Sequence, residues 1–435
     1  MKYIVFAFLF FCCYKIFKER GINKFIWFIT GMLMINSSYS PIIHSNSHYT
    51  LAIAYLLSLF IDPSFKISFK KYPIKELTIL ILITHILIGI FCEWQSVFQS
   101  LYRSILDYSI TFLMLFAGYH AINTNKDYDL LIKKMKPILL ITAIYGLICF
   151  LLKDNPYNKL VGISDVGINY DFFETNRGYR IAGFSNTSNP HAHLLTVLSF
   201  IIINRERNKF TYTLVILSLL NLLLSDSRAP LADLIILVSS YFLLTKGLSQ
   251  KIKIICTGGI LLLLLMQIPF IATFTDNLVM KITDTFAAEG ETEVTGSSIA
   301  LRLTQIESAW QYFIQKPFFG HGFGFYPEKI YIANTDNNGL WGMESYLLWL
   351  LVEQGIFMII LVFLFYSKIL SCIIKYNHIS YYKVPLTLTI VLIFHILLNR
   401  PTDVYEYFLP FIGIGIKLLQ INKQGNKCIP QLNTL

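Results

Sequence analysis

The placement of arginine is the first chemical signal in this sequence. The 435-residue chain has nine arginines and 27 lysines, and long apolar runs divide its loops into two alternating sets. One set holds only six lysines but six arginines, namely Arg103, Arg177, Arg180, Arg228, Arg302 and Arg400. The guanidinium of arginine is planar and permanently charged, and it can bind a phosphate group through two parallel hydrogen bonds. The ammonium of lysine acts as a point charge. This distribution indicates an anionic ligand on that side; the alternative is scattered snorkelling of arginine side chains at a membrane surface.

Arg177 and Arg180 belong to a polar stretch that could bind an anion and a sugar. The stretch reads RGYRIAGFSNTSNP, ends with Asn189 and Pro190, and is followed by an apolar run. A helix that starts after Pro190 would direct its first N–H groups toward this stretch, and such groups favour anions.

The two histidines that follow do not predict a metal site. His191 and His193 are two residues apart, so on a helix they point to different faces, and no third ligand lies near them in sequence. No pair of the seven cysteines has metal-site spacing. We therefore expect no metal and no other cofactor.

Arg228 lies at the tip of a tight hairpin between two apolar runs, in the stretch LSDSRAPL. So short a hairpin would hold the arginine at the depth of lipid headgroups, near their phosphates. Placing a charge at membrane depth costs about 2.5–3.5 kcal/mol on insertion scales, so residues of this kind are functional candidates by default. Asp226 could instead pair with Arg228 as a structural clamp.

A third stretch combines an amphipathic helix with a glycine-rich turn. Its apolar residues recur at the spacing of one helical stripe: Ile299, Leu303, Ile306, Trp310 and Phe313. Because it lacks about 20 continuous apolar residues, this helix (297–315) should lie on the membrane rather than cross it, with Arg302 beside the stripe. Pro317 ends the helix, and the glycines around His321 would let the backbone approach a ligand closely.

Two carboxylates mark the start of the next apolar run. Glu344 enters at its outer boundary, and Glu353 lies deeper on the same run. A partly desolvated carboxylate at membrane level holds a proton more readily and can accept one from a sugar hydroxyl. Each could instead complement the helix dipole or pair with an arginine.

The elements that must position these residues are apolar helices. The chain is 55% hydrophobic and 14% charged, whereas soluble domains carry about 25% charged residues. Its apolar runs lack the alternation of a barrel, so they should cross the bilayer as helices. The expected spans are Tyr3–Phe17, Phe25–Pro41, His48–Ile61, Lys75–Cys92, Arg103–Ile122, Pro137–Leu152, Pro190–Asn204, Phe210–Ser225, Ala229–Thr245, Ile252–Ala272, Met343–Ile369, Lys383–Asn399 and Tyr405–Leu419. The first is short, so twelve and thirteen spans both remain open.

Basic residues in alternate loops set the orientation of the bundle. Of the 36 basic residues, 24 lie in one set of loops, which we assign to the cytoplasm together with the C-terminus. The opposite, periplasm-like side holds the longer loops at 153–189 and 273–342. The net charge of +10 suits anionic lipid headgroups, so we expect a bilayer and no nucleic acid as a partner. We predict one integral membrane domain over residues 1–435.

Together these stretches resemble the O-antigen polymerase and O-antigen ligase superfamily of bacterial surface-polysaccharide assembly. The resemblance covers about Phe210 to Phe365 and rests on three segments in order. They are the SDSRA hairpin at Arg228, the loop from RLTQIESAW at Arg302 to KPFFGHGFG, and the span ESYL…EQG that starts at Glu344.

The resemblance implies a GT-C-like fold and an inverting, metal-independent membrane glycosyltransferase of the inner membrane with its active site facing the periplasm. Such an enzyme takes a sugar chain from undecaprenyl diphosphate, and positions matching Arg228 and Arg302 bind the diphosphate. Arg180 or Arg177 matches a third arginine less closely. A chain-length regulator and a flippase are implied partners. We assign Glu344, Arg228 and Arg302 as catalytic and Arg177, Arg180, Asn189, His321 and Glu353 as substrate-binding.

One departure from the pattern favours a polymerase. Ligases carry a His-Asn pair where this chain has Glu344-Ser345, and that histidine is their proposed base. Glu344 is therefore our first candidate for the base and His321 the second. A ligase that transfers to lipid A-core, within lipopolysaccharide biosynthesis, remains an alternative, and so does a flippase of lipid-linked oligosaccharide.

Overall fold

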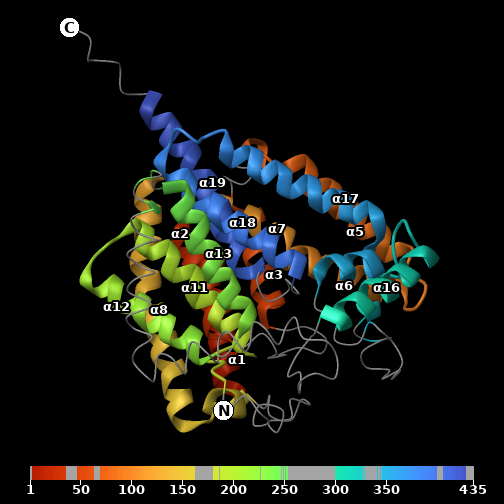
Figure 1. Ribbon diagram of the computed structural model, residues 1–435, viewed down its shortest axis with the longest axis horizontal. Helices are drawn as coiled ribbons and strands as arrows, with labels where there is room; N and C mark the ends of the chain where they lie inside the picture. The colour runs from red at the N-terminus through yellow and green to blue at the C-terminus, as the bar shows by residue number, and fades with distance from the viewer. Residues whose placement is uncertain are drawn as a thin grey trace. The chain divides into compact units, whose positions relative to one another are not determined.

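The computed structural model describes residues 2–35, 47–62, 69–161, 180–185, 187–225, 227–245, 247, 249, 251–252, 299–326, 328, 340, 343, 345–398 and 405–427 (Figure 1). These residues form helices and their connections, with no strand among them. In chain order the main helices are α1 (Lys2–Lys18), α2 (Ile22–Met34), α3 (Ser47–Ile61), α5 (Lys75–Ile90), α6 (Val97–Ile110), α7 (Phe112–Ala121), α8 (Asn125–Leu152), α9 (Pro156–Val161), α11 (Ser188–Arg205), α12 (Lys209–Leu224), α13 (Arg228–Thr245), α16 (Ile299–Gln315), α17 (Tyr346–Ile374), α18 (Lys383–Leu398) and α19 (Tyr405–Lys427).

The helices follow the expected spans closely. Apart from Ile252, the expected span Ile252–Ala272 lies outside the described residues, and the described part of each other span overlaps a helix or a pair of helices. The pair arises in Arg103–Ile122, where Thr111 has non-helical backbone angles (φ −95°, ψ −86°) and separates α6 from α7. The expected loop helix 297–315 is α16.

Two described helices, α8 and α17, are long and apolar enough to cross a membrane. Shorter apolar helices accompany them, including α2, α3, α7, α12 and most of α13 and α18. This all-helical architecture is compatible with a helical membrane protein. The number of spans and the periplasmic placement of the loops stay predictions.

Two helices carry exposed apolar stripes of the kind that lipid covers in membrane proteins. On α8, the side chains of Ile141, Ile144, Ile148 and Leu152 are all exposed, and their spacing places them on one face. On α12, Ile216, Leu219, Leu220 and Leu223 are likewise exposed. Soluble proteins rarely expose contiguous apolar surfaces of this kind, whereas a bilayer covers them.

The chain divides into two compact units. Unit 1 contains Met1–Ile86, Ser104–Leu237 and Leu361–Leu435, and unit 2 contains Leu87–Arg103 and Val238–Ile360. In unit 1, α8 packs against α2, α11 and α12, and α19 packs against α7 and α18 (Figure 1). A side chain at Gly118 or Gly413 would overlap the backbone of the facing helix, at Pro410 and Leu115 respectively. α7 and α19 therefore touch backbone to backbone, as small residues allow in membrane helices.

Unit 2 places α16, the turn after it and the start of α17 around a small core. Its buried residues are Ala309, Tyr326, Leu340, Met343 and Val352. α17 is interrupted at Gly355, where φ is 71° and ψ is −172°. At this break the N–H of Ile356 donates to the carbonyl of Pro317 at 2.9 Å, so the turn is docked on the interrupted helix.

Candidate functional site

Arg180 is tied directly to the hairpin that carries Arg228. Its Nε donates to the carbonyl of Ser225 at 3.1 Å, and its terminal nitrogen donates to the Ser227 hydroxyl at 3.0 Å. Ser225 is the C-cap of α12, and Arg228 is the first residue of α13. The fold of unit 1 therefore brings together the first two stretches singled out in the sequence.

The first turns of α11 and α13 lie side by side at the same place. The Ser227 hydroxyl donates to the Ser188 hydroxyl at 2.9 Å, and both side chains are buried. Ser188 opens α11 after the N-cap Thr187, and Pro190 fits in this first turn because no intrahelical donor is needed there.

Two helix N-termini and the Arg180 guanidinium give this corner a positive electrostatic character. The exposed N–H groups and the macrodipole at a helix start both favour an anion. The Arg180 guanidinium adds a full positive charge, and the backbone of Arg228 starts α13. Asn189, also predicted to bind substrate, is exposed on the first turn of α11. Such an arrangement can bind a phosphate group without a metal.

Several predicted site residues lie outside the described part of the chain. Arg177, Glu344 and Asp226 are among them, and the side chain of Arg228 is also outside it. The roles predicted for Arg177 and Glu344, and the clamp between Asp226 and Arg228, stay predictions.

In unit 2, α16 exposes the predicted apolar stripe. Leu303, Ile306 and Trp310 are at least half exposed, whereas Gln305 and Ala309 are buried against the unit. Arg302 is half-buried and lies beside the stripe. An exposed stripe of leucine, isoleucine and tryptophan suits a helix that rests in the membrane interface.

Glu353 fixes the glycine-rich turn. Its side chain is 2% exposed, and its two oxygens accept the N–H groups of Gly324 at 3.0 Å and Tyr326 at 2.9 Å. The backbone N–H groups of His321 and Gly322 donate to the carbonyls of Val352 and Glu353 at 2.9 and 2.8 Å. The turn is therefore a defined structure, with Glu353 as its acceptor.

The glycines of this turn are required by backbone geometry and by close approach. Gly320, Gly322 and Gly324 have φ values of 65°, 100° and 78°, which side chains disfavour. A Cβ at Gly320 would overlap the backbone of Glu353. The sequence predicted that the backbone of this turn approaches a ligand closely. In the structure the backbone that it approaches is that of α17.

Other polar groups of unit 2 hold the same turn. Arg103 pairs with Glu328 and lies over the ring of Trp94 at 5.5 Å. Lys316, at the end of α16, pairs with Glu93 at 2.5 Å. These contacts give Arg103 and Lys316 structural partners within unit 2.

His321, the second candidate for the base, is mostly buried in the turn. Its Nε2 donates to the carbonyl of Tyr312 at 3.0 Å, and its ring stacks on Phe325 with centroids 4.4 Å apart. Desolvation lowers the pKa of His321, against a smaller opposing effect of the bond to Tyr312. The neutral ring therefore has Nδ1 as the nitrogen that can accept a proton.

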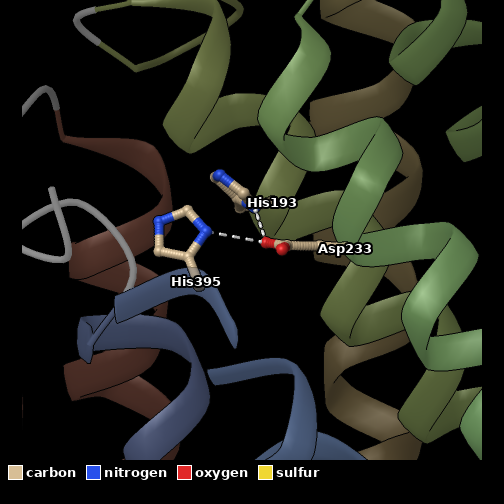
Figure 2. Close-up of side chains that lie close together, drawn as sticks. All are labelled: His193, Asp233 and His395. Atoms are coloured by element: carbon tan, nitrogen blue, oxygen red, sulfur yellow. Dashed lines mark ion pairs between the residues drawn. The ribbon is translucent and has the colours of Figure 1, made fainter. Parts of the chain in front are cut away.

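The sequence interpretation missed one cluster in unit 1. His193 on α11, Asp233 on α13 and His395 on α18 point toward one another, and all three are buried (Figure 2). The Nδ1 atoms of His193 and His395 each lie 3.0 Å from the same oxygen, Oδ2 of Asp233. Only ligands near in sequence were considered for His193, whereas its neighbours come from distant helices. Histidines and an aspartate within apolar runs were the available signal.

The neighbouring histidine, His191, has a different environment. Its Nε2 contacts the side-chain oxygen of Asn221 at 3.1 Å, and a side chain at Gly183 would overlap its ring. The two histidines therefore point to different faces of α11, as their spacing predicted.

The helices and their exposed apolar stripes are compatible with a helical membrane protein, and comparison with known proteins shows which family a segment of the chain matches. Residues 213–363 match the family model described as O-antigen ligase. This match confirms the resemblance to the O-antigen ligase and polymerase superfamily, whose members are membrane glycosyltransferase-like enzymes acting on lipid-linked polysaccharide. The matched segment contains Arg228, Arg302, His321, Glu344 and Glu353, whereas Arg180 precedes it. A search of curated proteins found no match.

Proposed function

We propose that this chain polymerises lipid-linked oligosaccharide repeat units at the periplasmic face of the bacterial inner membrane. The donor is a growing chain on undecaprenyl diphosphate, and the acceptor is a new lipid-linked repeat unit. The product is O-antigen or a similar surface polysaccharide. The observation that carries this proposal is the family match across the Arg228 hairpin, supported by the bond from Arg180 to that hairpin.

The donor diphosphate would bind through arginines and helix N-termini. Arg180 and the starts of α11 and α13 supply positive charge at one corner of unit 1. Arg228 and Arg302 have the diphosphate-binding role that the resemblance implies. Neutralising the charge of a diphosphate makes it a good leaving group, and groups preorganised for this charge supply the electrophilic help that a metal gives elsewhere. The transfer proposed is therefore metal-independent.

The reaction requires one base besides this electrostatic help. The acceptor hydroxyl loses its proton to the base while its oxygen attacks the sugar carbon, and the bond from that carbon to the diphosphate breaks. The attack comes from the face opposite the leaving group, so the configuration is inverted. Glu344 is the first candidate for this base, and Nδ1 of His321 is the second.

Two alternative functions differ from this proposal in their product. The family model that matches is described as O-antigen ligase, and a ligase would transfer the chain to lipid A-core. The Glu344-Ser345 pair, in place of the His-Asn pair of ligases, favours a polymerase. A flippase would move lipid-linked units across the bilayer unchanged. A chain-length regulator and a flippase would be partners of a polymerase.

A reconstituted assay separates these functions. The full chain, purified and placed in liposomes, is given synthetic undecaprenyl-diphosphate repeat units, with and without lipid A-core. A ladder of products without lipid A-core supports the polymerase. Product that forms only with lipid A-core identifies a ligase, and unmodified units on the opposite leaflet identify a flippase; either result rejects the polymerase.

A further inference from the structure

We propose that His193, Asp233 and His395 bind one divalent transition-metal ion that joins α11, α13 and α18. This inference does not depend on the glycosyl-transfer proposal, and no step of that transfer involves the ion. It rests on the geometry of three buried side chains from helices that are far apart in the sequence (Figure 2).

Two of the three separations between donor atoms are close to those expected of ligands to one ion. Both histidine Nδ1 atoms are 3.0 Å from Asp233 Oδ2, and the three ligand atoms all lie within 4.8 Å of one another. Nitrogen and oxygen ligands lie about 2.0–2.2 Å from zinc, so neighbouring ligand atoms of a tetrahedral site are about 3.3–3.6 Å apart, slightly farther than the two 3.0 Å distances.

The directions of the donor atoms favour an ion over a pair of hydrogen bonds. Despite the 3.0 Å distances, neither Nδ1 makes a well-directed hydrogen bond to Asp233 Oδ2, and these three atoms have no other such partner in the described part of the chain. The two imidazole rings are perpendicular, with centroids 4.7 Å apart. Ligands that share an ion need not donate hydrogen bonds to one another, so an ion accounts for short distances without directed hydrogen bonds.

The chemistry of the ligands selects the class of ion. Two imidazoles and one carboxylate suit zinc and neighbouring first-row metals, whereas calcium and magnesium prefer all-oxygen sites. Asp233 is 2% exposed, and a buried carboxylate is costly unless a positive charge compensates it. A divalent cation supplies that compensation.

The position of the cluster suggests what the ion would do. His193 and Asp233 each lie in the second turn of their helices, and His395 lies in the last turn of α18. The starts of α11 and α13 are the ones joined by Ser188 and Ser227. The ion would therefore hold three helix ends of unit 1 together next to the Arg180 corner.

Metal analysis of the purified full-length chain tests this inference. After incubation with excess zinc and desalting, the wild type should retain about one zinc per chain. Asp233→Asn and His395→Gln should retain none. His191→Gln is the matched control, because this buried histidine lies on the same helix but contacts Asn221, and its zinc content should equal that of the wild type. Zinc-free wild type, or zinc retained equally by Asp233→Asn, would overturn the proposal.

A second variant, whose bound metal can be detected by absorption spectroscopy, tests the site if Asp233→Asn and His395→Gln fold poorly. Asp233→Cys retains the two histidine ligands and replaces the carboxylate with a thiolate, so three ligands remain. Loaded with cobalt(II), it should show a thiolate-to-cobalt charge-transfer band in the near ultraviolet that cobalt-loaded wild type lacks. A folded Asp233→Cys chain that takes up cobalt without this band would place the ion elsewhere and reject the site.

Discussion

The hydroxyl of Ser227 donates a hydrogen bond to the hydroxyl of Ser188, and this 2.9 Å contact sets the starts of α13 and α11 side by side. Ser227 also accepts a bond from Arg180. One small buried side chain therefore links two helix starts and a guanidinium. Arg228 follows Ser227 directly, so the same link sets the start of the helix that carries it.

Ser227→Ala should weaken this corner without unfolding the protein. The variant loses one neutral hydrogen bond and one bond from a guanidinium, each of which contributes about 0.5–3 kcal/mol. We expect a lower melting temperature and a several-fold loss of polymer. Ser218→Ala is a suitable control, because that buried hydroxyl donates within α12, to the carbonyl of Leu214. Equal polymer yields from both variants would show that the hydrogen bonds of Ser227 to Ser188 and Arg180 are not needed for activity.

Arg228→Ala, Arg302→Ala and Arg180→Ala should each abolish detectable polymer while the amount of protein in the membrane stays unchanged. Losing one preorganised charge from a transition state costs about 10²–10³-fold in rate. The lysine variants keep the charge but lose the planar fork, so they should restore only part of the activity. Product ladders and immunoblots of membranes provide the measurement.

Arg205→Ala is the control for these arginines. Arg205 lies at the opposite end of α11, where it pairs with Asp129 at 2.6 Å, and both side chains are exposed. An exposed ion pair contributes little, so this variant should make normal ladders. Normal ladders from Arg228→Ala and Arg302→Ala would contradict the proposal that these two arginines bind the donor diphosphate.

Periodicity in the sequence predicted the helices and the exposed face of α16. The stripe through Leu303, Ile306 and Trp310 was read from spacing alone, and these side chains are exposed together. The interruption of α17 was not predicted, because apolar residues flank Glu353-Gln354-Gly355 on both sides and the whole segment was interpreted as one span. The break depends on a partner from another segment, the carbonyl of Pro317, and such contacts leave no local pattern.

The site could be predicted only in part from the sequence, because contacts between distant segments also build the site. Local chemistry singled out Arg180 and the Arg228 hairpin separately, and the fold joins them through Ser225 and Ser227. The cluster around Asp233 was missed because its members come from three helices. A buried aspartate in an apolar helix signals a partner but does not identify it.

Glu344→Gln and Glu353→Gln should fail in different ways. Both oxygens of Glu353 accept backbone N–H groups, so a glutamine there leaves one buried N–H facing an amide donor, at a cost of about 1–3 kcal/mol. We expect Glu353→Gln to lower the melting temperature and to retain residual polymer. Glu344→Gln should keep the melting temperature and lose polymer, because it removes the proposed base. Normal ladders from Glu344→Gln would make His321 the next candidate.

The stability of the protein should fall at acidic pH in part through His321. Burial lowers the pKa of His321 below the ordinary histidine value of about 6.5, so the unfolded chain binds a proton more readily than the folded one. The resulting stability is present above about pH 6.5 and is lost as the pH falls below it. His321→Gln can still donate to Tyr312 and does not titrate. Its melting temperature should therefore decline less than that of the wild type between pH 8 and pH 5, and equal declines would contradict this account.

The two ends of α11 should face opposite sides of the membrane. Asn189 is exposed in the first turn, and Arg207 is exposed just after the last one, where Lys136 and Arg205 form ion pairs with Glu206 and Asp129. Charge placement assigns the first end to the periplasm and the second to the cytoplasm.

In a background with its native cysteines replaced, a membrane-impermeant maleimide added to intact cells should label Asn189→Cys and leave Arg207→Cys unlabelled. Permeabilised cells should label both, which controls for the reactivity of each thiol. Labelling of Arg207→Cys alone in intact cells would invert the topology and place the Arg180 corner on the cytoplasmic side, where the proposed periplasmic polymerisation could not take place.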